Sequence, residues 1–230
     1  MRTIDVAQGG VRVVDSRSTA SLLSKVLWIT TVAFLFTAFG AYLAPDFLGA
    51  GIFFVFIVNL GLIFAINAAS RRSPALALVL MYAFATLMGV EIGPLLHSYL
   101  RFAGGQTVVF QAALTTAVGM ASMGMIAQIA RFNYQRVANY AFAALLGLIV
   151  IGLLSSFVHF LSPGLYAWAT LAIFSVLLLV DFMRLPDGGM GLTPVQLSLS
   201  IYLDALNIFI ALLQIFGNGN GGNRRRGSWS

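Results

Sequence analysis

The chain has 230 residues, of which 60% are hydrophobic and 9% charged, with a formal net charge of +6. A soluble domain carries about a quarter charged residues, so this composition excludes an ordinary soluble protein and predicts a polytopic membrane protein. The absence of cysteine excludes disulfides and thiolate metal sites, and arginines placed at helix ends and in tails do not indicate nucleic-acid binding.

Seven apolar segments follow one another, each close to the roughly 20 residues that a helix needs to cross a bilayer core. They are 22–43, 48–69, 74–98, 107–129, 137–158, 164–184 and 194–216. Because the connections are short, we predict one all-α, seven-helix transmembrane domain over 22–216, in contact with membrane lipid. An N-terminal arm (1–21) precedes it and a flexible basic tail (217–230) follows it. The arm lacks a signal-peptide cleavage pattern, so we expect the first helix to stay in place.

Arginine and lysine gather on one side of the predicted bundle. They lie in the N-terminal arm and at Arg71, Arg72, Arg131, Arg136 and Arg184, whereas the opposite loops carry only Arg101. The positive-inside rule therefore places the N-terminus in the cytoplasm. Seven spans put the tail outside, although its three arginines favour the inside. Short loops without added domains favour a bacterial plasma membrane.

The third segment contains one carboxylate, Glu91, between Gly89 and the Gly93-Pro94 step. A Gly-Pro step loosens a helix and frees backbone carbonyls. Counted from Pro74, Glu91 lies about 25 Å along the helix, toward the non-cytoplasmic side. Two interpretations stay open: the carboxylate reaches the outer interface, or it forms an outer mouth that attracts cations.

The last two segments each contain an aspartate, Asp181 and Asp204. Asp204 lies roughly 15 Å along its helix from Pro194, and Asp181 lies one turn before Arg184. The loop between the segments is short, so it brings the cytoplasmic ends of both helices together. Two close carboxylates do not both ionise cheaply and titrate as one unit, which predicts a proton-sensitive pair. The alternative for Asp181 is an interfacial ion pair with Arg184.

The seventh segment begins with Thr193-Pro194-Val195-Gln196, a capping box with proline in the first turn. Polar or small residues then recur on one helix face. They are Gln196, Ser200, Asp204, Asn207, Ala211 and Gln214. Such a face contacts partner helices or water. For Ser200 and Asn207 we favour hydrogen bonds between helices.

Three stretches resemble motifs of the transmembrane Bax inhibitor motif family. They are GVEIGPLL (89–96), VVFQAALTTAV (108–118) and SLSIYLDALNIFIALLQIFG (198–217). The resemblance implies seven helices with the last one central, and a passive, pH-sensitive calcium leak without a cofactor. In that family two aspartates form the site, and they match Asp181 and Asp204, which would hold calcium transiently.

The chain departs from the family pattern at two places. The family commonly reads tyrosine-aspartate at the sixth-helix site, where this chain reads Val180-Asp181. Many members carry arginine where Gln214 stands, so a salt bridge from that position cannot form. The resemblance also implies an arginine that latches the aspartates closed, for which Arg71 and Arg72 are both candidates.

Three function classes follow from these features. The leading prediction is the proton-gated cation leak, which is not an enzyme. The alternative is a membrane-embedded regulator of stress and cell death, or of a membrane-bound protease, acting through protein contacts as the resemblance implies. The third class is an intramembrane aspartyl protease. Such enzymes carry glycine-x-glycine-aspartate at the second site, and this chain reads Tyr202-Leu203-Asp204 there.

Overall fold

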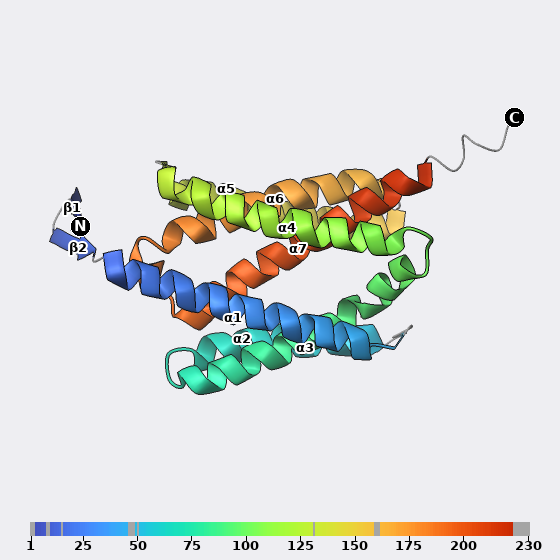
Figure 1. Ribbon diagram of the computed structural model, residues 1–230, viewed down its shortest axis with the longest axis horizontal. Helices are drawn as coiled ribbons and strands as arrows, with labels where there is room; N and C mark the ends of the chain where they lie inside the picture. The colour runs from blue at the N-terminus through green and yellow to red at the C-terminus, as the bar shows by residue number, and fades with distance from the viewer. Residues whose placement is uncertain are drawn as a thin grey trace, which may run out of the picture. The chain divides into compact units, whose positions relative to one another are not determined.

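The computed structural model describes the backbone of residues 3–7, 10–14, 16–45, 49, 51–130, 132–158 and 162–222. Seven α-helices follow one another in this part of the chain (Figure 1). They are α1 (Ser16–Leu43), α2 (Gly51–Ala69), α3 (Pro74–Leu100), α4 (Gly105–Ile129), α5 (Tyr134–Val158), α6 (Pro163–Arg184) and α7 (Pro194–Gly222). The predicted all-α membrane bundle is confirmed.

Six of the described helices are long and apolar enough to cross a membrane, while the apolar stretch of α2, Phe53–Ala69, is shorter. Of these six, α7 is the most buried, with 56% of its apolar window inside the protein against 33% or less for the others. This burial agrees with the inner position expected for the last helix. Large side chains such as Trp28 and Tyr42 of α1 and Ile129 of α4 are exposed, as lipid-facing residues of a membrane protein are.

The two ends of the chain differ from the expectation. The arm contains a hairpin that the sequence analysis did not predict, formed by antiparallel strands β1 (Thr3–Ala7) and β2 (Gly10–Val14). Helix α1 begins at Ser16, inside the predicted arm, and α7 continues to Gly222, inside the predicted tail. Glycine lowers helix propensity by about 1 kcal/mol but does not end a helix as proline does, and no proline follows Pro194. Residues 223–230 of the tail lie outside the described residues.

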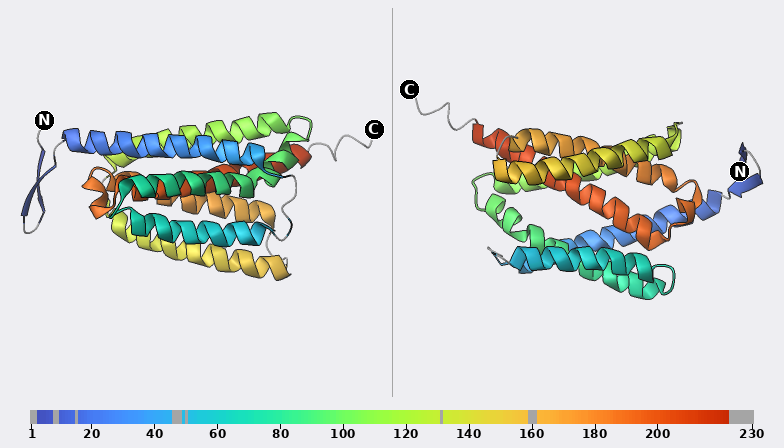
Figure 2. Two further views of the ribbon diagram at one scale, coloured as in Figure 1. Left: turned by 90° about the horizontal axis from the view of Figure 1, so that it is seen from below. Right: turned by 180° about the vertical axis from the view of Figure 1, so that it is seen from behind.

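The chain divides into two compact units. The first comprises Met1–Ser98 and Arg184–Tyr202, and the second comprises Tyr99–Met183 and Leu203–Ser230. Helices α1, α2 and α3 lie side by side in the first unit, and α4, α5 and α6 belong to the second (Figure 2). Helix α7 begins in the first unit and continues in the second.

Small residues bring α1 and α3 into close contact in the first unit. A Cβ added at Gly89 of α3 would overlap the backbone carbonyl of Thr37 in α1, and one added at Gly40 of α1 would overlap the carbonyl of Thr86 in α3. Membrane helices use such residues because lipid offers no hydrophobic drive for association and packing must supply it. The glycines therefore set the distance between these two helices.

Tyr202, in the first turns of α7, fills the core of the first unit. It is fully buried, and its hydroxyl lies 2.7 Å from the Thr37 hydroxyl of α1. Its ring packs against Phe34 at 5.1 Å and against Phe84 at 6.1 Å between centroids. Tyr202 does not belong to the polar face predicted for this helix. A helix as buried as α7 has protein contacts on more than its polar face, and a buried tyrosine hydroxyl requires a partner there.

The start of α7 has the predicted capping geometry. The backbone N–H of Gln196 donates to Thr193 Oγ1 at 3.3 Å, and Gln196 Oε1 accepts from the backbone N–H of Thr193 at 3.0 Å. The reciprocal bonds satisfy two backbone donors that a helix start otherwise leaves open. They fix the residue at which α7 begins, and hence which residues share each face of the helix.

The connection from α6 to α7 is short, as predicted, and contains a single 3-10 turn, η1 (Gly188–Gly191). All four of its residues have positive φ angles, between 51° at Met190 and 80° at Gly191. Glycine adopts this left-handed region without a steric cost, which explains three glycines in four positions. Among the described residues, Met190 is the only residue other than glycine with a positive φ angle.

Candidate functional site

The two aspartates singled out in the sequence are both buried in the second unit. Asp181 of α6 is 3% exposed and Asp204 of α7 is 6% exposed. Their chain neighbours Phe182 and Ala205 are buried as well. Burial of this degree is unusual for carboxylates, because removing a charge from water is costly. Asp181 is therefore not a solvated charge at a helix end.

The remaining predicted residues fall into both units. Asn207 and Gln214 of α7 lie in the second unit with the aspartates. Glu91, Gln196 and Ser200 lie in the first unit. Arg71 and Arg72 also lie there, exposed in the turn between α2 and α3. The role of these arginines as a latch stays a prediction.

The polar face of α7 makes different contacts at its two ends. Gln196 caps the helix and donates through Nε2 to Asn67 Oδ1 of α2 at 3.0 Å, so it does connect two helices. Asn207 was expected to do the same, and for this residue a bond between helices stays a prediction. Its Nδ2 donates to the Leu203 carbonyl of its own helix at 2.8 Å. An i−4 bond of this kind leaves the amide beside its own backbone.

Glu91 is half-buried in α3 and accepts a hydrogen bond from Asn59 Nδ2 of α2, at 2.9 Å from its Oε2. Asn59 is 3% exposed. Because its partner is buried, the Glu91 carboxylate is directed at a neighbouring helix rather than away from the protein. Neither of the two interpretations from the sequence, a carboxylate at the outer interface or an outer mouth, predicted this contact.

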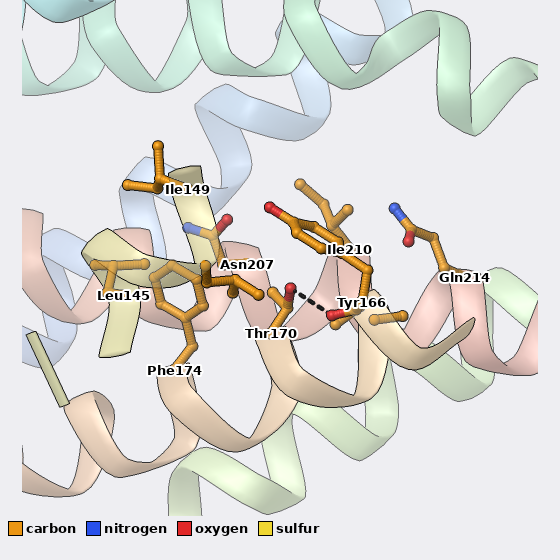
Figure 3. A pocket seen from close by; sticks show the side chains of 11 residues that line it. Leu145, Ile149, Tyr166, Thr170, Phe174, Asn207, Ile210 and Gln214 are labelled. Carbon is orange, nitrogen blue, oxygen red and sulfur yellow. Dashed lines mark hydrogen bonds between the residues drawn. The ribbon is translucent and has the colours of Figure 1, made fainter. Parts of the chain in front are cut away.

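The second unit contains a cavity of about 300 Å³ between α5, α6 and α7 (Figure 3). Its polar border consists of Tyr166 and Thr170 of α6 and Asn207 and Gln214 of α7. Tyr166 extends its ring from α6 into this cavity (Figure 3). The other lining residues are aliphatic or aromatic, such as Phe174. The cavity therefore borders the same polar face of α7 that includes Asp204.

The sequence analysis did not identify two polar residues of this cavity, Tyr166 and Thr170. Together with Phe174 they recur every four residues, which places them on one helix face. Two hydroxyl side chains four residues apart in an otherwise apolar segment indicate a polar patch on that helix face. The space for Tyr166 comes from α5, where a Cβ added at Gly152 would lie 2.8 Å from the Tyr166 hydroxyl.

No group of three or more histidine, cysteine, aspartate or glutamate side chains that could hold a metal ion occurs among the described residues. Stable calcium sites use six to eight oxygen ligands. Two carboxylates supply four oxygens, fewer than that number, and transient calcium contact at Asp181 and Asp204 stays a prediction.

Comparison with known proteins supports the resemblance seen in the motifs. The sequence model of the family described as "Inhibitor of apoptosis-promoting Bax1" matches residues 19–221. An uncharacterised protein of Campylobacter jejuni is 30% identical over 72% of this chain and 71% of its own length. Uncharacterised membrane proteins of Streptococcus pyogenes and Vibrio cholerae are 31% and 30% identical, each over 70% of this chain and 72% of the relative.

The family match covers α2 to α6 whole and most of α1 and α7. The relatives from Streptococcus pyogenes and Vibrio cholerae are named as membrane proteins. This chain therefore belongs to the family of inhibitors of apoptosis-promoting Bax1 and is an integral membrane protein.

Proposed function

We propose that the protein is a pH-sensitive passive leak for cations, with calcium as the transported ion and the Asp181–Asp204 pair as its gate. The observation that carries this proposal is the burial of both carboxylates, 3% and 6% exposed, on consecutive helices of one unit. Carboxylates inside a membrane protein are costly and mark ion pathways or proton relays. Two in one site titrate together, so their shared charge depends on pH.

The cavity in the same unit supports a pathway. Asp204, Asn207, Ala211 and Gln214 share one face of α7, and all but Asp204 line the cavity. A cation that leaves Asp204 would therefore meet amide oxygens next. A space of about 300 Å³ holds several waters and a partly hydrated ion. Weak, successive contacts of this kind favour passage over storage.

The membrane and the orientation are part of the proposal. The arginine and lysine bias supports a cytoplasmic N-terminus, and bacterial relatives support a bacterial plasma membrane. A passive leak also needs no catalytic residue, which fits a protein that is not an enzyme.

The test is calcium flux into dye-loaded proteoliposomes across a pH series. We expect Asp181→Asn and Asp204→Asn each to alter the flux and weaken its pH dependence, because either change leaves one carboxylate that no longer shares a proton. The double variant is expected to lose the pH dependence. The matched control is Asp187→Asn, which neutralises an exposed carboxylate in the α6–α7 connection and should behave as the wild type. A double variant with the wild-type pH dependence would refute the gate.

A further inference from the structure

A second buried polar contact lies in the first unit, outside the proposed gate. Asn59 of α2 is 3% exposed, and its Nδ2 donates to Glu91 Oε2 of α3 at 2.9 Å. The same Nδ2 lies 3.4 Å from the Met88 sulfur. Both donor bonds of this carboxamide therefore go to α3.

The other half of the Asn59 carboxamide is left without a partner. Its Oδ1 is buried and accepts no hydrogen bond from any described residue. Exchanging the amide oxygen and nitrogen does not help, because it would turn the oxygen toward an ionised carboxylate and lose the bond to Glu91. A buried acceptor left unsatisfied is destabilising. Some donor is expected at this oxygen.

A proton on Glu91 supplies that donor. A protonated carboxyl group has one O–H donor and keeps an acceptor oxygen, and a carboxamide has the complementary N–H donor and oxygen acceptor. Glu91 would then donate to Asn59 Oδ1 while it still accepts from Asn59 Nδ2. This arrangement requires a rotation only about the terminal side-chain torsions of Glu91 and Asn59. Such torsions have broad energy minima, so the rotation costs little.

The charges around Glu91 favour the protonated form. Among the described residues no lysine or arginine forms an ion pair with Glu91. Helix α2, which supplies Asn59, contains no titratable side chain. From α7, Tyr202 is close enough to interact with Glu91 electrostatically, and the Tyr202 hydroxyl is hydrogen-bonded to Thr37. The titratable residues described in α1, Lys25 and Tyr42, are exposed. An ionised carboxylate within the membrane would lack a compensating cation here.

We propose that Glu91 and Asn59 form a proton-binding site in the first unit, with Glu91 carrying a proton that it donates to Asn59 Oδ1 at neutral pH. Calcium does not fit instead, because two oxygen-bearing side chains and a thioether do not provide the six to eight oxygens that it uses. The site does not depend on the calcium leak. A neutral Glu91 also attracts no cations, so this site and the outer mouth exclude each other.

Glu91 is the one glutamate in the chain, so it can be observed alone. The full-length protein is made by cell-free synthesis with carboxyl-¹³C glutamate and reconstituted in lipid nanodiscs. Infrared and ¹³C magnetic resonance spectra then report the protonation state of this single carboxyl group. We expect the signal of a protonated acid at neutral pH, converting to carboxylate at alkaline pH. A carboxylate signal at neutral pH would overturn the proposal, and this measurement needs no variant.

The role of Asn59 is tested in the same sample. Asn59→Leu should move the carbonyl stretching band of the acid to higher frequency, because the hydrogen bonds to the carboxamide are lost. The matched control is Asn67→Leu, on the same helix, where the amide bonds to Ile63 and Gln196 instead. It should leave the band unchanged. A band that Asn59→Leu does not affect would show that the amide does not hold the proton.

Discussion

At the scale of single residues, several buried hydroxyls among the described residues gain their partners from other helices or from their own backbone. Thr37 does both, since its Oγ1 lies 3.0 Å from the Ala33 carbonyl and 2.7 Å from the Tyr202 hydroxyl. Ser198 is also fully buried and lies within hydrogen-bond distance of the Pro194 and Val26 carbonyls. Polar groups inside a membrane protein thus connect helices as well as marking ion paths.

Tyr202 allows the packing and hydrogen-bond contributions to be separated. Tyr202→Phe removes one hydroxyl and should lower the free energy of unfolding by about 0.5–1.5 kcal/mol, because Thr37 keeps its backbone bond. Tyr202→Ala also empties the space between Phe34 and Phe84 and should cost about 3–5 kcal/mol. Both are measured by unfolding in detergent. Tyr42→Ala, at a residue 81% exposed, is the control, and equal losses for the two alanine variants would contradict the buried role.

At the scale of helices, α1 and α3 approach through glycine rather than through large apolar side chains. Gly89→Ala should lower stability by about 1–3 kcal/mol, because its Cβ would overlap the Thr37 carbonyl and force the helices apart. Gly61→Ala in α2 is the matched control, since a Cβ there meets nothing within 4 Å. That change should be neutral, or stabilising by up to about 1 kcal/mol. A Gly89→Ala variant as stable as Gly61→Ala would show that the contact between α1 and α3 is not tight.

The cavity in the second unit gives a prediction about transport. Ala211 lines it and is 1% exposed, so Ala211→Leu would fill part of the space. We expect a severalfold lower calcium flux in proteoliposomes with an unchanged pH midpoint, because Asp181 and Asp204 are untouched. Gly147→Ala on α5, where a Cβ meets nothing within 4 Å, should leave the flux as in the wild type. Full flux in Ala211→Leu would place the ion path elsewhere.

At the scale of the whole molecule, the sequence was sufficient for the features that depend on local pattern. Hydropathy predicted the seven helices because a bilayer requires long apolar segments, and Thr193 with Gln196 predicted the start of α7. The partners of buried side chains could not be predicted in the same way. Asn59 and Glu91 are 32 residues apart in the chain, and their contact depends on how α2 and α3 pack. The cavity likewise depends on three helices at once.

Helix α7 continues without a break from its cap at Thr193 to Gly222. This continuity fixes the distances between its residues along the helix axis. Asp204 and Gln214 are held about 15 Å apart along its axis, since each residue of a helix adds 1.5 Å. The length of the polar track between them therefore cannot stretch. If the cavity beside this polar face widens, α7 must rotate or tilt as a rigid helix, or α5 and α6 must move relative to it.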